Sequence, residues 1–312
     1  MKKGILLLVF MLLIVLFLLL HIRLFSSPPP VEDSDNGEQT SSTTTVRIHF
    51  LDIGQGDATL IEFPTGEQIL IDCAIDARVL EALGRVMPVY DKHIDYLFLT
   101  HPDKDHYGGC VDVLERFEVG TVVYTGFERD EGFFNRFVEG VYKEQSIYTI
   151  IEHEQTWSIA SSTLTFLYPD HALKDNPHIP GLEKQEISPN NSSLVLLLQS
   201  YGTSVLLTGD AESEQEAYLV ERYGKRLDVD IYKAGHHGSS GSSIQPLIDI
   251  VTPSDTIFSA GKENSYGHPS PRIMRRVERA GSTVWRTDTN GDILVTINTL
   301  GYAISAQYPS SQ

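Results

Sequence analysis

Residues 46–312 alternate short apolar runs with amphipathic stretches, and this alternation constrains the fold more than any other feature. Three apolar runs between Val46 and Asp72 are separated by turn sequences and predict an antiparallel meander. Further on, the helical pattern from Arg78 to Val86 precedes the apolar run from Ile94 to Thr100, and the second half of the chain repeats this texture. We therefore expect one α/β domain over residues 46–312, built as a sandwich of two sheets with helices outside.

Composition excludes several classes of protein. The chain of 312 residues has 42 acidic and 24 basic side chains, and its net charge of −18 argues against a protein that holds nucleic acid by bulk electrostatics. Four of the acidic and three of the basic residues lie in residues 1–45, so the acidity belongs to the domain itself. The only two cysteines, Cys73 and Cys110, exclude a disulfide scaffold and a Cys-rich zinc module. One bridge between them and two small buried thiols both stay open.

The amino-terminal end reads as a membrane-targeting segment. Lys2 and Lys3 precede an unbroken apolar run from Gly4 to Leu20, which predicts a signal anchor or signal peptide over residues 1–25. Residues 26–45 are rich in Pro, Ser, Thr and acidic residues and predict a flexible linker. By the positive-inside rule, the domain then lies on the extracytoplasmic face of the cell membrane, anchored if the segment is retained and secreted if it is cleaved.

The hexapeptide from His101 to His106 is the densest cluster of ligand-type side chains. His101, Asp103, Asp105 and His106 offer imidazole nitrogens and carboxylate oxygens, the donors that zinc and manganese accept. The hexapeptide follows a predicted buried strand, so its side chains would project from the edge of a sheet. The alternative is a solvated polar loop in which one of the aspartates caps a helix.

Other polar residues also stand where apolar runs stop. Asp72, Asp210 and the pair His236-His237 each follow a predicted strand, and the ends of strands are where open sheets place their sites. A single carboxylate of this kind is usually a cap or turn former, and a single histidine is usually a surface residue. The presence of such residues at the ends of several predicted strands favours a functional site.

Two loops are interpreted separately. Gly54-Gln55-Gly56-Asp57 could cradle a phosphate, but we interpret it as a tight turn whose carboxylate bonds backbone amides. The polar stretch from Pro169 to Asn191 is too long for an ordinary connection and is a candidate lid or binding loop.

These motifs together resemble a known superfamily, the metallo-β-lactamase fold, through Asp72, His101-x-Asp103-x-Asp105-His106, Thr208-Gly209-Asp210 and His236-His237-Gly238-Ser239. Within it, three stretches are similar to the extracytoplasmic hydrolase domain of ComEC-type DNA-internalisation competence proteins: Phe50 to Ala58, Asn191 to Leu196 and Asn264-x-x-x-His268-Pro269. The common superfamily motif has His where this chain has Asp103, a substitution that the competence-type subgroup shares. Those proteins also carry a polytopic channel domain, whereas this chain has one apolar segment, so we expect no DNA channel.

The resemblance implies a four-layer αβ/βα sandwich with two divalent metal ions, Zn²⁺ or Mn²⁺, at one edge of the sheets. It implies that His101 and Asp103 hold the first metal and that Asp210 bridges both. The second metal would be held by Asp105, His106 and one histidine of the next pair, here assigned to His236.

The resemblance also implies supporting roles around the metals. Asp72 would orient a ligand or the attacking water. His237, the other member of the pair, or His268 would protonate the leaving group. The alternatives are that His237 only hydrogen-bonds its loop and that His268 only precedes a helix.

We therefore expect a metal-dependent hydrolase, in the first place a phosphodiesterase. Its substrates would be single-stranded nucleic acid or an envelope phosphodiester such as phosphorylcholine or teichoic acid. Because the domain is acidic, no stable nucleic-acid complex is expected. The alternatives are a lactone or β-lactam hydrolase and a catalytically silent binding protein on the same fold.

Overall fold

The computed structural model describes residues 44–129, 132–262 and 264–308. The predicted membrane segment at residues 1–25 lies outside these residues, and so does the linker up to residue 43. Among the described residues, no helix is both long and apolar enough to cross a bilayer.

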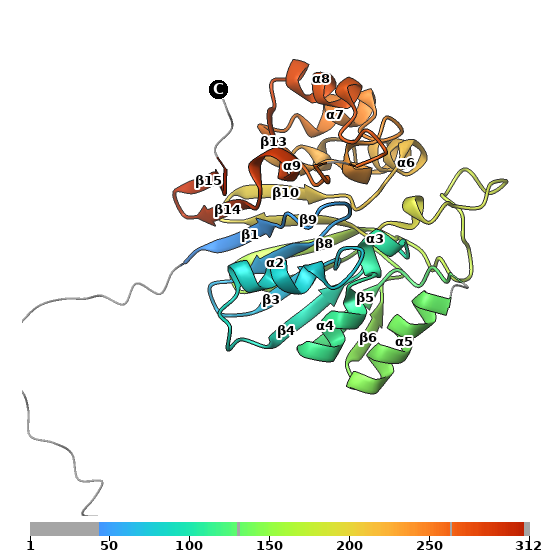
Figure 1. Cartoon of the computed structure of the whole chain (residues 1–312). Coiled ribbons are helices and arrows are strands. Elements are labelled where there is room, and N and C mark those ends of the chain that lie inside the picture. Colours follow the sequence, from blue (N-terminus) through green and yellow to red (C-terminus); the bar gives the residue numbers. More distant parts are fainter. Residues whose placement is uncertain (1–43, 130–131, 263, 309–312) are drawn as a thin grey trace, which may run out of the picture. The chain divides into compact units, whose positions relative to one another are not determined.

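The first sheet has eight strands in the order β15-β14-β1-β2-β3-β4-β5-β6 (Figure 1). In chain order they span Val46–Phe50 (β1), Thr59–Glu62 (β2), Gln68–Ile71 (β3), His93–Phe98 (β4), Glu118–Tyr124 (β5), Ile147–Ile150 (β6), Ile293–Asn298 (β14) and Gly301–Ala306 (β15). Strands β1 to β3 pair antiparallel, which confirms the predicted meander, while β3 to β6 run parallel. The last two strands return to this sheet, where β14 pairs antiparallel with β1.

The second sheet has seven strands in the order β13-β12-β11-β10-β9-β8-β7. They span Gln155–Ile159 (β7), Ser162–Tyr168 (β8), Val195–Ser200 (β9), Thr203–Leu207 (β10), Ile231–Lys233 (β11), Asp255–Phe258 (β12) and Thr283–Arg286 (β13). Strands β10 to β13 are parallel, so their carboxyl ends meet at one edge.

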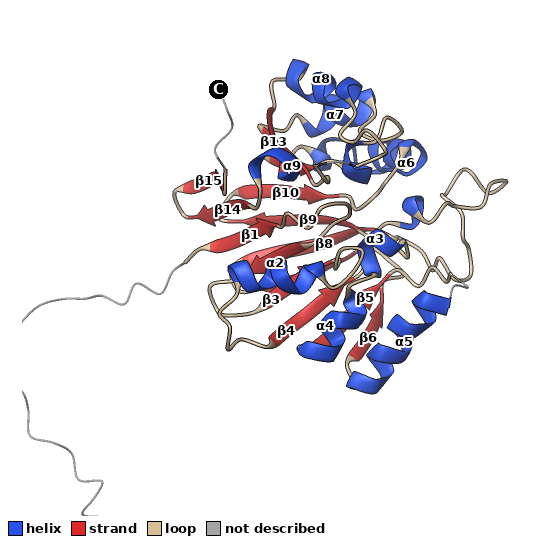
Figure 2. Ribbon diagram, in the orientation of Figure 1, coloured by secondary structure: helices blue, strands red, loops and turns tan. Residues whose placement is uncertain are grey.

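Helices cover the outer side of each sheet (Figure 2). They span Arg78–Val86 (α2), Lys104–Tyr107 (α3), Cys110–Arg116 (α4), Gly132–Glu144 (α5), Ser213–Tyr223 (α6), Gln245–Val251 (α7), Pro271–Arg279 (α8) and Thr287–Asn290 (α9). Three 3₁₀ turns span Asn190–Ser192 (η1), Gly224–Leu227 (η2) and Gly235–Gly238 (η3).

Three apolar cores separate the layers. Side chains of both sheets, such as Phe98 and Leu196, form the central core. One outer core joins the first sheet to α2, α4 and α5, and the other joins the second sheet to α6, α7 and α8. Neighbouring residues of β9 alternate between cores, with Leu196 in the central one and Leu197 in the outer one, as the period of a strand requires. The expected αβ/βα sandwich of two sheets is therefore confirmed.

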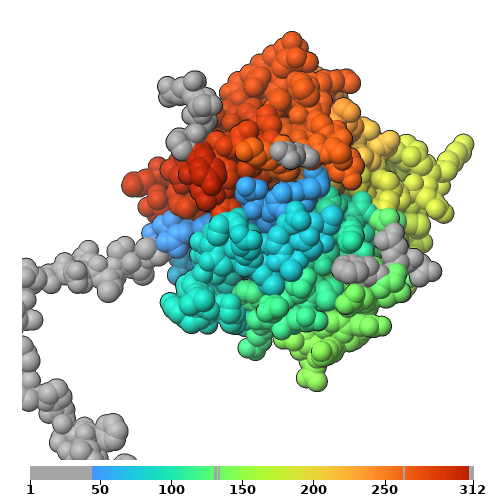
Figure 3. Space-filling view, viewed as in Figure 1, coloured from blue at the N-terminus to red at the C-terminus, as the bar shows by residue number. Residues whose placement is uncertain are grey.

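Two strands, β7 and β15, carry only a weak signal in the sequence. Strand β7 follows the acidic stretch near Glu154, and its first four residues alternate between partly buried and exposed, so its apolar signal is weak. Strand β15 lies at the edge of the first sheet, where its side chains are partly buried or exposed. In the space-filling view, the red surface of the carboxyl-terminal strands lies beside the blue surface of the first strands (Figure 3).

The two cysteines form a disulfide, which settles the question that the sequence left open. Cys73 and Cys110 are buried, with their Cα atoms 5.1 Å apart. The bridge joins the residue after Asp72 to the start of α4, and the chain between the two cysteines contains the hexapeptide His101–His106. The backbone N–H of Cys73 also donates to the carbonyl oxygen of His106 at 2.7 Å. The bridge thus fastens the first group of candidate ligands to the end of β3.

Candidate metal centre

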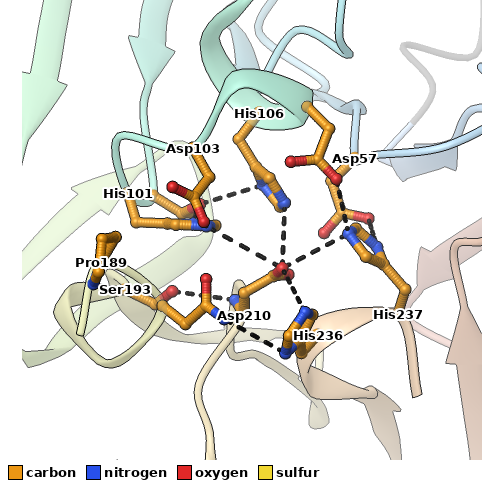
Figure 4. Close-up of polar contacts among 12 residues, drawn as sticks. Asp57, His101, Asp103, His106, Pro189, Ser193, Asp210, His236 and His237 are labelled. Carbon is orange, nitrogen blue, oxygen red and sulfur yellow. Dashed lines mark hydrogen bonds and ion pairs between the residues drawn. The ribbon is translucent and has the colours of Figure 1, made fainter. Parts of the chain in front are cut away.

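The carboxyl ends of parallel strands bring the candidate ligands together. In the first sheet, Asp72 follows β3 and the hexapeptide follows β4, and these strands are adjacent and parallel. In the second sheet, Asp210 follows β10 and the His236-His237 pair follows β11, again adjacent and parallel. Figure 4 shows the labelled side chains of both halves pointing toward one another.

Asp210 lies at the centre of the cluster and is 2% exposed. Its Oδ2 atom faces the Nε2 atom of four histidines, at 3.3 Å from His106, 3.4 Å from His237, 3.9 Å from His236 and 4.0 Å from His101 (Figure 4). Its backbone N–H donates to the Ser193 hydroxyl at 2.9 Å, which fixes the turn that carries it.

Each of these histidines is held from behind through its other ring nitrogen. The Nδ1 atom of His106 lies 2.7 Å from Asp72, and that of His237 lies 3.4 Å from Asp57. The Nδ1 atom of His236 lies 3.1 Å from Glu212, and that of His101 lies 3.0 Å from the Thr100 hydroxyl. In His106, His236 and His101 this contact is a hydrogen bond, which fixes the tautomer and leaves Nε2 as an acceptor, whereas Nδ1 of His237 faces Asp57 at ion-pair distance. All four rings therefore present Nε2 to the same small volume.

Asp72 is completely buried and makes three contacts. Its Oδ1 accepts from the backbone N–H of Thr100 at 2.8 Å, and its Oδ2 accepts from the Thr100 hydroxyl and faces His106 Nδ1, both at 2.7 Å. Both oxygens point toward the strand end of β4 rather than into the space around Asp210. This is the placement of a group that orients a ligand.

Asp103 and Asp105 flank the cluster on opposite sides. One Asp103 oxygen lies 3.7 Å from His101 Nε2, and the other pairs with the guanidinium of Arg129. Asp105 lies 3.4 Å from His237 Nε2 and also accepts from the Gln55 amide at 3.4 Å. The resemblance implies that His101 and Asp103 hold one metal together, and the structure keeps that pair close.

The two histidines of the pair have different surroundings. His237 is 1% exposed, and its Nε2 lies 3.4 Å from both Asp105 and Asp210. The His236 side chain is 24% exposed and lies at the rim. Both have a left-handed backbone, with φ of 52° and 47°, which costs about 1–3 kcal/mol per residue and is typical of functional sites.

His268 lies beside this pair but outside the central group. Its ring centroid is 5.4 Å from that of His236 and 6.5 Å from that of His237. Burial, with the neighbouring imidazoles, lowers the pKa of His268 to about 4, so its ring is neutral near pH 7.

Sequence reasoning missed Asp57, Lys233, Arg129 and Glu212. Asp57 does not bond backbone amides as the turn interpretation expects: it pairs with the buried Lys233 ammonium and faces His237. The Asp57–Lys233 pair joins the first sheet to the second, so no local sequence pattern predicts it. Its one local signal is Gly56, where a Cβ would lie 2.1 Å from the Asp105 carbonyl oxygen, so only glycine lets this loop approach the hexapeptide.

The electrostatics of the cluster call for positive charge at its centre. Burial alone would raise the pKa of Asp210, but His237 and His106 hold it well below its usual range. Burial alone would likewise lower the pKa of His237, yet Asp210 and Asp57 raise it to about 10. The carboxylates of the cluster thus strongly favour the protonated, cationic form of a buried imidazole. A divalent metal ion would supply the positive charge that these carboxylates favour.

The hydrogen-bonding state of the donor atoms also favours a metal ion at the centre of the cluster. Among the buried atoms that have no hydrogen-bond partner in the described part of the chain, four surround one volume: Nε2 of His101, His106 and His237, and Oδ1 of Asp210. An unsatisfied buried polar group costs about 1–3 kcal/mol, so four around one volume need a common partner. Asp57, His106, Asp210 and His237 offer donor atoms that all lie within 4.8 Å of one another. Nitrogen and oxygen donors in this number fit a divalent metal ion.

Comparison with known proteins agrees with this geometry. Residues 51–262 match the family described as the metallo-beta-lactamase superfamily. The chain belongs to that superfamily. A solved metallo-beta-lactamase fold protein, YhfI from Bacillus subtilis, shares the fold with a TM-score of 0.51 and 12% identity, over 77% of this chain and 95% of that one.

The expected similarity to competence proteins is also confirmed. The chain is 29% identical over 265 residues to ComE operon protein 3 of Bacillus subtilis, and 29% identical over 247 residues to competence protein ComA of Neisseria gonorrhoeae. It is 30% identical over 267 residues to recombination protein 2 of Haemophilus influenzae. The matches cover 79%, 77% and 80% of this chain but only 32%, 30% and 29% of the lengths of those relatives. Fold and donor cluster together indicate a metal-dependent hydrolase.

Proposed function

We propose that this protein is a phosphodiesterase that uses two divalent metal ions, Zn²⁺ or Mn²⁺. The observation that carries the proposal is the arrangement around Asp210, whose Oδ2 faces the Nε2 atoms of four histidines on two sheets. A carboxylate in this position is suited to bridge two metals. Two ions bound here would lower the pKa of a water molecule and polarise a phosphoryl oxygen.

The ligand sets follow from which donors lie together. His101 and Asp103 would hold one ion, and Asp105, His106 and His237 the other, with Asp210 between them. We assign His237 rather than His236 to the second ion because His237 is buried and lies 3.4 Å from Asp105, whereas His236 is at the rim. The other residues of the site orient these ligands: Asp72 holds His106, Asp57 holds His237, and Thr100 holds His101.

His236 and His268 are not needed as metal ligands and are the candidates to assist departure of the leaving group. His236 contacts Glu212 at 3.1 Å and reaches the rim of the cluster, so it could deliver a proton to a departing oxygen. His268 is neutral near pH 7 and would serve as a hydrogen-bond partner for the substrate.

A phosphodiester substrate is supported by the relatives. Two of them are named for competence and for recombination, and recombination acts on DNA, a phosphodiester polymer. Both single-stranded nucleic acid and an envelope polymer contain the bond in question. The acidity of the chain opposes a stable complex with a long polyanion, so we propose transient contact with the substrate.

We further propose that the domain acts on the extracytoplasmic face of the cell membrane, held by residues 1–25, or is secreted if these are removed. The disulfide between Cys73 and Cys110 supports this location, because such bonds persist in oxidising compartments. Protease treatment of intact cells is the test. Digestion of the domain without lysis is expected, and protection until lysis would contradict the location.

The activity is tested with bis-p-nitrophenyl phosphate and the purified full chain, with and without added zinc or manganese. We expect metal-dependent turnover that His106→Ala removes. His153→Ala, which changes an exposed histidine outside the site, is the matched control and should retain it. Hydrolysis of lactone or β-lactam rings without any phosphodiester hydrolysis would contradict the proposal.

A further inference from the structure

A cavity of about 630 Å³ lies next to the candidate metal centre. It is formed by α5, the loop after β5, strand β6 and the long loop after β8, and its lining includes Tyr124, Arg129, Phe134, Tyr142, Tyr148 and Lys174. Its volume falls within the roughly 300–1,000 Å³ typical of small-molecule sites. We call it the aromatic cavity.

Arg129 connects the aromatic cavity to the metal centre. Its guanidinium pairs with Asp103, and it also donates to the Pro102 carbonyl oxygen at 3.4 Å. A ligand in the cavity therefore lies one arginine side chain away from the candidate ligands of the first metal. Arg129 thus places a positive charge between the cavity and Asp103.

Tyrosine and phenylalanine rings give the cavity its chemistry. Tyr124 and Phe134 are buried, with ring centroids 5.7 Å apart, and form its floor. Tyr142 and Tyr148 lie at its mouth and are 74% and 39% exposed. Exposed aromatic rings beside a concave surface are typical of binding sites rather than of stable monomer surfaces.

Charge narrows the choice of ligand. Lys174 and Arg129 lie on the rim of the cavity, although the chain as a whole has a net charge of −18. Lys174 contacts Glu128 at 2.8 Å, but both side chains are more than half exposed, so this pair is weak and easily exchanged for another anion. Two cations beside aromatic rings suit a flat, uncharged ring system attached to a phosphate, and they oppose a cationic headgroup.

We propose that the aromatic cavity binds an unpaired nucleobase adjacent to the phosphodiester that the metal centre hydrolyses. This inference rests on the proposed function and names the substrate as a single-stranded nucleic acid. In Figure 3 the green surface of α5 and the yellow surface of the loop after β8 lie on the same side of the molecule. The base would stack on Tyr148 and Tyr142, with its phosphate beside Arg129 and toward the metal ligands.

The test measures binding with EDTA present, so that nothing is cleaved. The full chain is titrated against a fluorescein-labelled oligothymidylate and against the same oligonucleotide with abasic sugars. Stacking of one base on an aromatic side chain contributes about 1–3 kcal/mol, which is about 5- to 150-fold in Kd. We expect Tyr142→Ala and Tyr148→Ala to weaken binding of the oligothymidylate within this range and to leave the abasic oligonucleotide unaffected. Tyr90→Ala, an exposed tyrosine before β4 at the opposite end of that strand, is the matched control.

Several outcomes would overturn the inference: equal affinity of the wild-type chain for both oligonucleotides, equal losses for both in the variants, or no loss in either variant. Displacement of the oligothymidylate by phosphocholine at lower concentration than by thymidine 5′-monophosphate would also overturn it, in favour of a cationic headgroup.

The two proposals can fail separately. Turnover of bis-p-nitrophenyl phosphate without base-dependent binding would refute the aromatic cavity alone. Base-dependent binding without such turnover would refute the phosphodiesterase and leave the cavity as a nucleotide site.

Discussion

The two halves of the site hold their histidines in different ways. In the first half, Asp72 holds His106 from the neighbouring strand end at 2.7 Å, and the disulfide braces the same region. In the second half, His237 depends on Asp57, which comes from the other sheet and is itself paired with Lys233. One support is local and covalently braced, and the other crosses the sandwich. We therefore expect a change at Asp72 to act on metal binding, and changes at the crossing or at the disulfide to act on the stability of the fold.

The largest effect is expected from Lys233→Met. Lys233 and Asp57 are both buried, and removal of one partner of a buried ion pair leaves an uncompensated charge that costs about 3–5 kcal/mol. Urea unfolding of the metal-free protein should show this loss. Lys225→Met, at an exposed lysine of η2, should change stability by less than about 0.5 kcal/mol. A loss below about 1 kcal/mol at Lys233 would show that the pair does not hold the halves together.

Removal of the disulfide should have the next largest effect. Replacing both cysteines by alanine frees a loop whose ends are 37 residues apart. The loss of this loop constraint should lower the free energy of unfolding by about 3–4 kcal/mol. The same unfolding experiment measures it. Dithiothreitol should lower the stability of the wild-type chain to a similar degree and have no effect on the double variant. If the reductant affects both proteins equally, the bridge is not the cause.

Asp72→Asn sharpens the comparison because it changes the local support alone. Loss of the carboxylate behind a metal-binding histidine typically lowers metal affinity by about 10- to 100-fold, and we expect this range for the second metal. Competition with a chromophoric zinc chelator measures it. Asp249→Asn, on the exposed face of α7, is the control. Unchanged affinity in Asp72→Asn would mean that His106 is not a ligand.

Glu212→Gln should have the smallest effect. The Glu212 and His236 side chains are 27% and 24% exposed, so their interaction is screened by water, and we assign neither to a metal. The same chelator assay should show a loss of less than about tenfold. A loss as large as that of Asp72→Asn would move His236 into the ligand set in place of His237.

The sequence predicts the parts of this site that are local. The hexapeptide His101–His106, Asp210 and the His236-His237 pair each follow an apolar run, and parallel pairing of those strands brings them to one edge. The choice between His236 and His237 depends on two consecutive left-handed residues, which spacing does not reveal. Asp57, Lys233 and Arg129 act through pairings with distant segments, so their roles depend on tertiary packing.

The most direct test of the account counts metal ions. Mass spectrometry of the full chain, after removal of weakly bound ions, should find two divalent ions per wild-type chain and turnover of bis-p-nitrophenyl phosphate. Asp210→Ala should lose bound metal and turnover together, because its carboxylate faces all four histidines. Unchanged metal content and activity in Asp210→Ala would contradict the bridging role and with it the proposed centre.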